Sequence, residues 1–211
     1  MSASSDRIQG TWLLTSLSFP FALIVWNLFF ISTAIAQPGA QTASVDLDQL
    51  VQSAATILRG HVVSATLEPH PQFSNLQTIF VTIAVGRVLK GQTAPTYTFR
   101  QFVWDEHDDV AGGYLKSGEL LLFLNPVSPY GLTSPVGLEQ GRFRILRDTK
   151  GTAYAVNGRS NLGLFNQVQN KASSRGVSFS RQAQAMLAKS GGQVSLESLE
   201  DAIVSLVGTN K

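Results

Sequence analysis

The chain of 211 residues contains no cysteine. It therefore forms no disulfide, carries no lipid on a processed N-terminal cysteine, and has no thiolate that binds a metal or attacks a substrate. Charged residues are few, at 14%, and there are only three histidines. The hydrophobic share of 44% is nevertheless that of an ordinary globular domain and not of a disordered chain.

The common sequence motifs of catalysis are also absent. The sequence has no Gly-x-Ser-x-Gly turn for a serine nucleophile, no phosphate-binding P-loop and no glycine-rich dinucleotide fingerprint. We therefore expect no cofactor, and we predict a non-catalytic binding or interaction module of the cell envelope rather than an enzyme.

The N-terminal apolar run is the most informative segment. Residues 12–35 carry no charge, and the run closes on Ala34-Ile35-Ala36. Signal peptidase accepts two small residues placed in this way, so residues 1–36 are predicted to be a signal peptide and the protein periplasmic or secreted. Because the run is comparable in length to the ~20 residues that span a bilayer, a retained anchor in the inner membrane is the alternative. Contact with a membrane is expected only in that case.

The rest of the chain is predicted to form one domain with flanking segments. Asp46 or Asp48 is placed to cap a short helix that carries Leu47, Leu50 and Val51 on one face. The predicted parts are a flexible lead-in at 37–45, a β-domain at 46–158, a mobile polar segment at 159–193 with at most one short helix, and a C-terminal helix at 194–208.

Alternating apolar and polar residues predict most of the chain to be β-structure. Expected strands cover 57–67, 76–89, 97–104, 119–124, 142–146 and 153–156. The continuous apolar run at 119–124 indicates a central strand that is buried on both faces. Strands joined by glycine-containing turns favour a small antiparallel barrel or a sandwich, with the helix at 194–208 packed against it through Leu199 and Ile203.

One acidic segment is a candidate metal site. Asp105, His107, Asp108 and Asp109 lie within five positions, and hard cations prefer several oxygen ligands from one loop. This segment supports the alternative function, a metal-dependent hydrolase. The spacing matches no EF-hand and no zinc motif, so a solvated loop between two strands explains the residues equally well.

Basic residues gather in the second half of the chain. Between Arg142 and Lys189 there are nine basic residues and one acidic residue, Asp148. Arg142 and Arg144 alternate around Phe143, so both should project from one strand face. They are candidate ligand-binding residues for an anionic envelope component; nucleic acid is not an expected partner outside the cytoplasm. The sequence leaves the oligomeric state open.

Aromatic residues alternate along the third expected strand. This segment contains one basic residue, Arg100, and the aromatic residues Tyr97, Phe99, Phe102 and Trp104. Such a pattern indicates either a surface on which sugars and other rings stack or a strand with both faces covered. Arg100 and Trp104 are therefore further candidate ligand-binding residues.

The motifs of several strands occur together in one order. They are ILRGHV at 57–62, VLKG at 88–91, SGELLLFL at 117–124, GLEQGRF at 137–143 and the helix at 194–207. In this order the chain resembles a family of exported, uncharacterised bacterial proteins. It is also similar to netrin/tissue-inhibitor-like modules, and that similarity implies an OB-like β-barrel flanked by helices. The cysteines of those modules are missing here, and the resemblance supplies no catalytic residues.

Overall fold

The computed structural model describes residues 43–103 and 113–208. All of them belong to the unit that spans residues 39–211, which is distinct from the unit formed by residues 1–38. The elements are α2 (Leu47–Ser53), β1 (Thr56–Pro69), β2 (Gln77–Lys90), β3 (Thr96–Phe102), β4 (Glu119–Leu124), η1 (Leu138–Gln140), β5 (Arg142–Arg147), β6 (Ala153–Asn157), α3 (Val168–Ser174), α4 (Arg181–Leu187), β7 (Val194–Ser195) and α5 (Leu196–Gly208). Among the described helices, none is long and apolar enough to cross a membrane.

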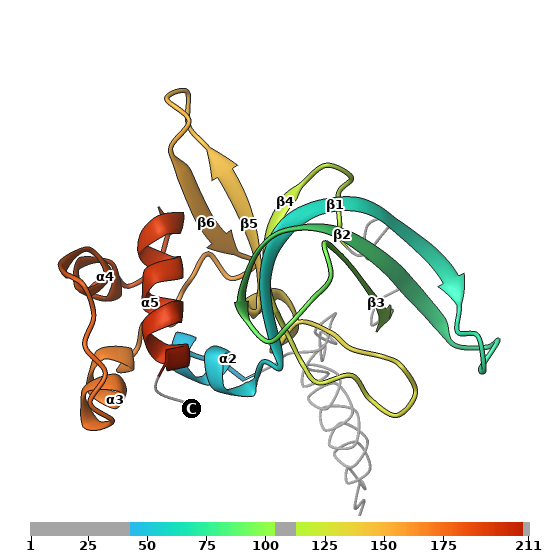
Figure 1. Cartoon of the computed structure of the whole chain (residues 1–211), viewed down its shortest axis with the longest axis horizontal. Helices are drawn as coiled ribbons and strands as arrows, with labels where there is room; N and C mark the ends of the chain where they lie inside the picture. The colour runs from blue at the N-terminus through green and yellow to red at the C-terminus, as the bar shows by residue number, and fades with distance from the viewer. Residues whose placement is uncertain (1–42, 104–112, 209–211) are drawn as a thin grey trace, which may run out of the picture. The chain divides into compact units, whose positions relative to one another are not determined.

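The strands form one antiparallel sheet in the order β3-β2-β1-β4-β5-β6-β7 (Figure 1). The prediction of a mostly β fold with a short N-terminal helix and a docked C-terminal helix is confirmed. The seven strands do not close into a barrel, because β3 and β7 stand at opposite ends of this order.

One half of the sheet is nevertheless strongly curled, as the bent ribbons of β1 and β2 show in Figure 1. The β1–β2 ladder contains three register shifts, and such irregularities bend strands and increase their twist. Gly60 lies at one of them, where an added Cβ would come within 2.3 Å of the Ala84 carbonyl oxygen. The close approach of the two backbones therefore requires glycine at this position.

A loop, and not a further strand, connects the outer edge of β3 with the end of β4. This loop, residues 125–135, forms an isolated bridge to β3 at Arg100↔Leu132 and another to β4 at Leu124↔Pro135. The Thr133 N–H donates to the Arg100 carbonyl oxygen at 2.9 Å, so the outer edge of β3 is partly covered. The curled half is thus bounded by four strands and this loop.

Two hydrophobic cores lie on opposite faces of the sheet. The helix-side core joins Leu121, Phe123 and Phe143 of the sheet to residues of all four α-helices. The sheet-side core fills the curl with apolar side chains, namely Leu58, Val62, Ile79, Val81, Ile83, Phe99, Tyr114, Leu120, Leu122 and Leu124. Every residue of β4 is buried, which confirms the prediction of a central strand covered on both faces.

The N-terminal helix is built as the sequence predicts. Asp46 is its N-cap and forms a capping box with Gln49, in which each side chain accepts from the other residue's backbone N–H. At the other end, Lys90 Nζ donates to the Val51 carbonyl oxygen at 2.7 Å and so satisfies one of the free carbonyls of the last turn. Burial lowers the pKa of Lys90.

The expectation of at most one short helix in residues 159–193 is wrong, because this segment contains both α3 and α4. Its scattered apolar residues are buried in the helix-side core, namely Leu164, Phe165, Val168, Ala172, Val177, Phe179, Ala183, Met186 and Leu187. These residues are too few and too irregularly spaced to give a periodic signal, yet each supplies area to one common core.

A buried amide network ties the start of this segment to the sheet. Asn161 Nδ2 donates to the carbonyl oxygens of Ala155 and Gly192, and Asn157 Nδ2 donates to that of Gln140. The Asn157 and Asn161 side-chain oxygens accept backbone N–H groups in turn. Buried polar groups stabilise a fold only when they are paired, and these are.

Candidate functional site

The candidate metal ligands Asp105, His107, Asp108 and Asp109, together with Trp104, lie outside the described residues. In the parts of the chain that are described, no three His, Asp or Glu side chains gather in a way that could hold a metal ion.

Two of the three arginine candidates are engaged within the protein. Arg100 donates to Glu68 Oε1 at 2.5 Å and to Thr78 Oγ1 at 2.8 Å, and its guanidinium lies 5.0 Å from the centre of the Phe80 ring. With only 13% of its side chain exposed, Arg100 links the first three strands. These contacts hold the strands together and leave little of the guanidinium group accessible to a ligand.

Arg142 is similarly enclosed. Its guanidinium pairs with Glu139 and lies 4.7 Å from the centre of the Tyr114 ring, with 11% of the side chain exposed. The Tyr114 hydroxyl donates to Gln101 Oε1 at 2.7 Å, and burial raises the pKa of Tyr114. Arg142 and Arg144 do flank the inward-facing Phe143 as predicted, but of the two only Arg144 is exposed.

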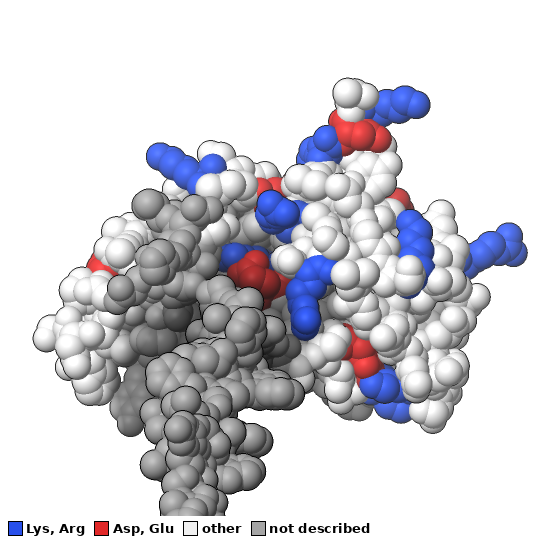
Figure 2. All heavy atoms as spheres, turned by 180° about the vertical axis from the view of Figure 1, so that it is seen from behind, with Lys and Arg blue, Asp and Glu red and all other residues white. Residues whose placement is uncertain are grey.

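The other basic residues are also divided between internal pairs and solvent. Lys171 pairs with Asp46 and Arg175 with Asp48, so α3 is fixed to the first turn of α2. On the face shown in Figure 2, the basic side chains lie apart from one another instead of merging into one patch, and several border acidic ones.

A network of ion pairs, the charge network, lies at the border of the helix-side core and links α5 to the strands of the sheet. Glu200 of α5 accepts from Arg59 Nε at 2.8 Å and from Arg87, while Glu119 of β4 accepts from Arg59 Nη1 at 2.6 Å and from Arg147 Nη2 at 2.7 Å. Burial alone would raise the pKa of Glu119, but the hydrogen bonds and charges of Arg59 and Arg147 outweigh it, so the pKa lies below its ordinary value. Each carboxylate oxygen has an arginine partner, which makes the network structural.

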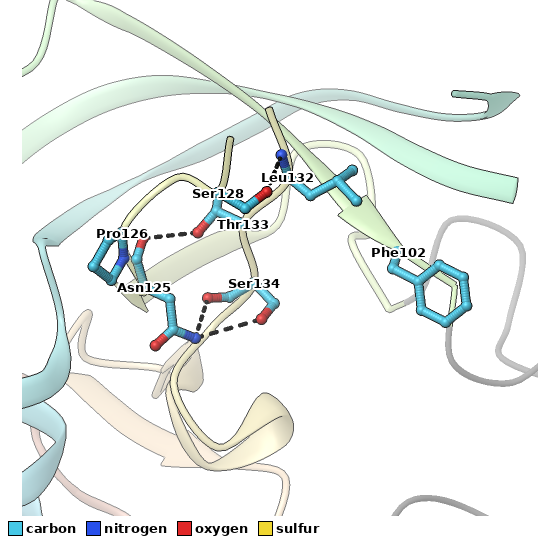
Figure 3. A pocket seen from close by; sticks show the side chains of 7 residues that line it. All are labelled: Phe102, Asn125, Pro126, Ser128, Leu132, Thr133 and Ser134. Carbon is cyan, nitrogen blue, oxygen red and sulfur yellow. Dashed lines mark hydrogen bonds between the residues drawn. The ribbon is translucent and has the colours of Figure 1, made fainter. Parts of the chain in front are cut away.

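A cavity of about 360 Å³ lies between the end of β3 and the 125–135 loop. Its described lining residues are Phe102, Asn125, Pro126, Ser128, Leu132, Thr133 and Ser134. In Figure 3, Phe102 stands on one side and the loop residues on the other. We call this space the loop cavity. The sequence did not predict this cavity, because its walls come from two segments that are far apart in the chain. Of its lining residues, only Phe102 belongs to a pattern noted in the sequence, the alternating aromatic residues of the third expected strand.

Hydrogen bonds within the loop fix the shape of the loop cavity (Figure 3). Thr133 Oγ1 donates to the Asn125 carbonyl oxygen at 2.8 Å, and Asn125 Nδ2 donates to the Ser134 carbonyl oxygen at 3.0 Å. Ser128 Oγ accepts from the Leu132 N–H at 3.1 Å. A site held in this way loses little conformational freedom when a ligand binds.

The tip of the loop is anchored to the β1–β2 turn. His70 Nε2 lies 2.8 Å from the Tyr130 carbonyl oxygen, and the rings of Phe73 and Tyr130 meet edge to face with centroids 5.6 Å apart. The Gln72 N–H donates to His70 Nδ1, so Nε2 is assigned as the donor to Tyr130. His70 therefore positions the loop.

No protein-family model, no curated protein and no solved structure matches this chain. The resemblance to exported bacterial proteins and to OB-like modules thus stays a prediction from the sequence. The arguments about function that follow rest on the loop cavity and on the distribution of charge.

Proposed function

We propose that this chain is an exported, non-catalytic binding module of the cell envelope, and that its ligand occupies the loop cavity. Support for export comes from the apolar N-terminal run that ends at Ala34-Ile35-Ala36. Support for the site comes from its preformed shape and its volume, which falls within the ~300–1,000 Å³ range of ligand pockets.

The observation that carries the non-catalytic part is the chemistry of the lining. Among the described residues around the loop cavity, none is Asp, Glu, His, Lys or Arg. Acid–base catalysis needs a group that changes protonation near neutral pH, and a serine nucleophile needs a base beside it. Seven neutral side chains supply contacts and no proton transfer, which favours binding.

Retention of the mature chain on purified cell-wall polymer tests this proposal. The probe variant is Ser134→Phe, which places a large ring in the loop cavity, and the matched control is Ser64→Phe on the exposed part of β1. We expect retention of the parent and of the control and loss in Ser134→Phe. Equal retention of all three proteins would contradict a ligand site in the loop cavity.

The alternative function, a metal-dependent hydrolase, depends on residues outside the described part of the chain. Elemental analysis of the purified protein separates the two functions. Stoichiometric zinc or manganese that disappears in Asp105→Asn/Asp108→Asn would support the hydrolase and contradict a purely binding role. Intact mass of protein from the native cell tests export, since cleavage predicts a chain that begins at Gln37.

A second contact with an anionic envelope component is favoured by the β5–β6 hairpin. Arg144 and Lys150 are exposed there and form no ion pair with any residue that the structure describes. In Figure 1 the turn end of this hairpin, which carries Lys150, projects beyond the rest of the sheet, so that side chain can reach an extended polymer, while Arg144 lies exposed where β5 pairs with β4. Contacts of this kind weaken with salt, because charges more than roughly 8–10 Å apart are screened at physiological ionic strength.

A further inference from the structure

The described lining of the loop cavity offers no partner for a charged ligand. A charged group that enters a partly enclosed site loses hydration, and only an opposite charge or several strong hydrogen bonds offset that loss. The described lining residues offer no charge of either sign. We therefore infer that the ligand portion in contact with these residues is neutral.

The polar groups of the lining suit a ligand that both donates and accepts hydrogen bonds. Ser128 Oγ accepts from the Leu132 N–H and Ser134 Oγ accepts from Asn125 Nδ2, so each hydroxyl keeps its own hydrogen for another acceptor. Thr133 Oγ1 donates within the loop and keeps its lone pairs for another donor. Ligand hydroxyl groups match both kinds of site.

Three of the described lining residues are apolar. Phe102, Pro126 and Leu132 contribute carbon surface on both sides of the loop cavity (Figure 3). A ligand that is neutral, carries hydroxyl groups around its edge and has an apolar C–H face combines all three properties, and a pyranose ring has this form. The volume, at the small end of the ~300–1,000 Å³ range, suits one or two such rings.

We propose that the loop cavity binds an uncharged saccharide unit, with its C–H face against Phe102 and Leu132 and its hydroxyl groups against Ser128, Thr133 and Ser134. This inference rests on the proposed function and names the ligand class of the same site. The rigid anchoring of the loop through His70 and Tyr130 keeps the three hydroxyl groups in place before the ligand arrives.

Calorimetric titration of the mature chain with four soluble probes tests the inference. The probes are the neutral disaccharides maltose and N,N′-diacetylchitobiose, the charged sugar glucuronic acid, and the apolar ring compound cyclohexanol. We expect saturable binding of at least one neutral disaccharide, the same dissociation constant at low and high salt, and no binding of glucuronic acid. Ser134→Phe should abolish this binding and Ser64→Phe should preserve it.

The other outcomes separate this inference from the proposed function. Binding of cyclohexanol without any saccharide, or tighter binding of glucuronic acid, would overturn the saccharide assignment and leave the loop cavity as a ligand site. Binding of a disaccharide that survives in Ser134→Phe would place the sugar elsewhere and overturn the inference. If no probe binds while retention on cell-wall polymer still depends on Ser134, the saccharide assignment fails and the proposed function stands.

Discussion

The helix-side core and the sheet-side core use alternate residues of the same strands, yet they are closed by different means. Four helices cover the first, and its border carries the buried carboxylates Glu119 and Glu200 with their arginine partners. The second is closed by the curl of the sheet, by Tyr114 and by a neutral loop. The buried helices and the paired charges stabilise the fold, whereas the loop cavity lies on the sheet-side half, beside the 125–135 loop.

The largest expected effect lies in the helix-side core. Leu199 is fully buried in α5, so Leu199→Asp places an unpaired carboxylate among apolar side chains and should cost roughly 3–5 kcal/mol or prevent folding. Val204, on the same helix, is 46% exposed, and Val204→Asp should leave the melting temperature almost unchanged. If both variants melt like the parent, α5 does not dock on the sheet.

Neighbouring residues of β4 test whether the two cores are one folding unit. Leu121 faces the helix-side core and Leu122 the sheet-side core, and both are fully buried. Each change to alanine should cost roughly 2–5 kcal/mol through lost burial and a cavity. Both variants should still unfold in a single transition in urea, followed by circular dichroism. Two separated transitions would show that each core melts by itself.

The charge network should make the border of the helix-side core sensitive to acid. The pKa of Glu119 is lowered in the folded state, so its contribution is fully present above the ordinary glutamate pKa of about 4.3 and is lost as pH falls through the lowered pKa. Glu119→Gln should cost about 1–3 kcal/mol at neutral pH and progressively less in acid. Urea unfolding at several pH values measures this.

The matched control for this change is Glu139→Gln. Glu139 pairs with Arg142 but is 54% exposed, so its loss should cost at most about 1 kcal/mol. An equal cost for the two variants at every pH would mean that burial of the Glu119 pairs adds nothing.

The smallest expected effect concerns Arg144, an exposed basic residue of the β5–β6 hairpin whose side chain belongs to neither core. Arg144→Ala should leave stability within about 0.5 kcal/mol and weaken retention on an anionic cell-wall polymer at low salt. At high salt the parent and the variant should behave alike, because the charges are screened. Retention that ignores both salt and Arg144 would assign Arg144 to a solvated face.

Local patterns predicted most of the fold. The alternation in β2, the apolar run of β4 and the Asp46 cap each report on neighbouring residues in the sequence, so one segment contained the whole signal. The two-residue strand β7 and the packing of α3 and α4 depend on residues far apart in the chain, such as Asn161 and Gly192. A repeating pattern of apolar residues within one segment does not predict contacts between such distant residues.

The same reasoning explains which candidate residues could be placed correctly from the sequence. Arg144 was placed correctly on an exposed face, because strand alternation decides it. The enclosure of Arg142 depends on Tyr114 and Glu139, and the loop cavity depends on Phe102 meeting a loop that begins at Asn125. The asparagine, serine and threonine residues of that loop have the composition of an ordinary turn, so only the tertiary structure reveals their second use.

The position of Glu119 at the start of β4 has a consequence for how the strands align. Residues 120–124 are all large and apolar, so a slip of one position would exchange the faces of the strand with little loss of hydrophobic burial. The same slip would turn the Glu119 carboxylate into the sheet-side core, away from Arg59 and Arg147. A buried charge without a partner is costly, so this one residue specifies the register of a strand whose other side chains would accept either.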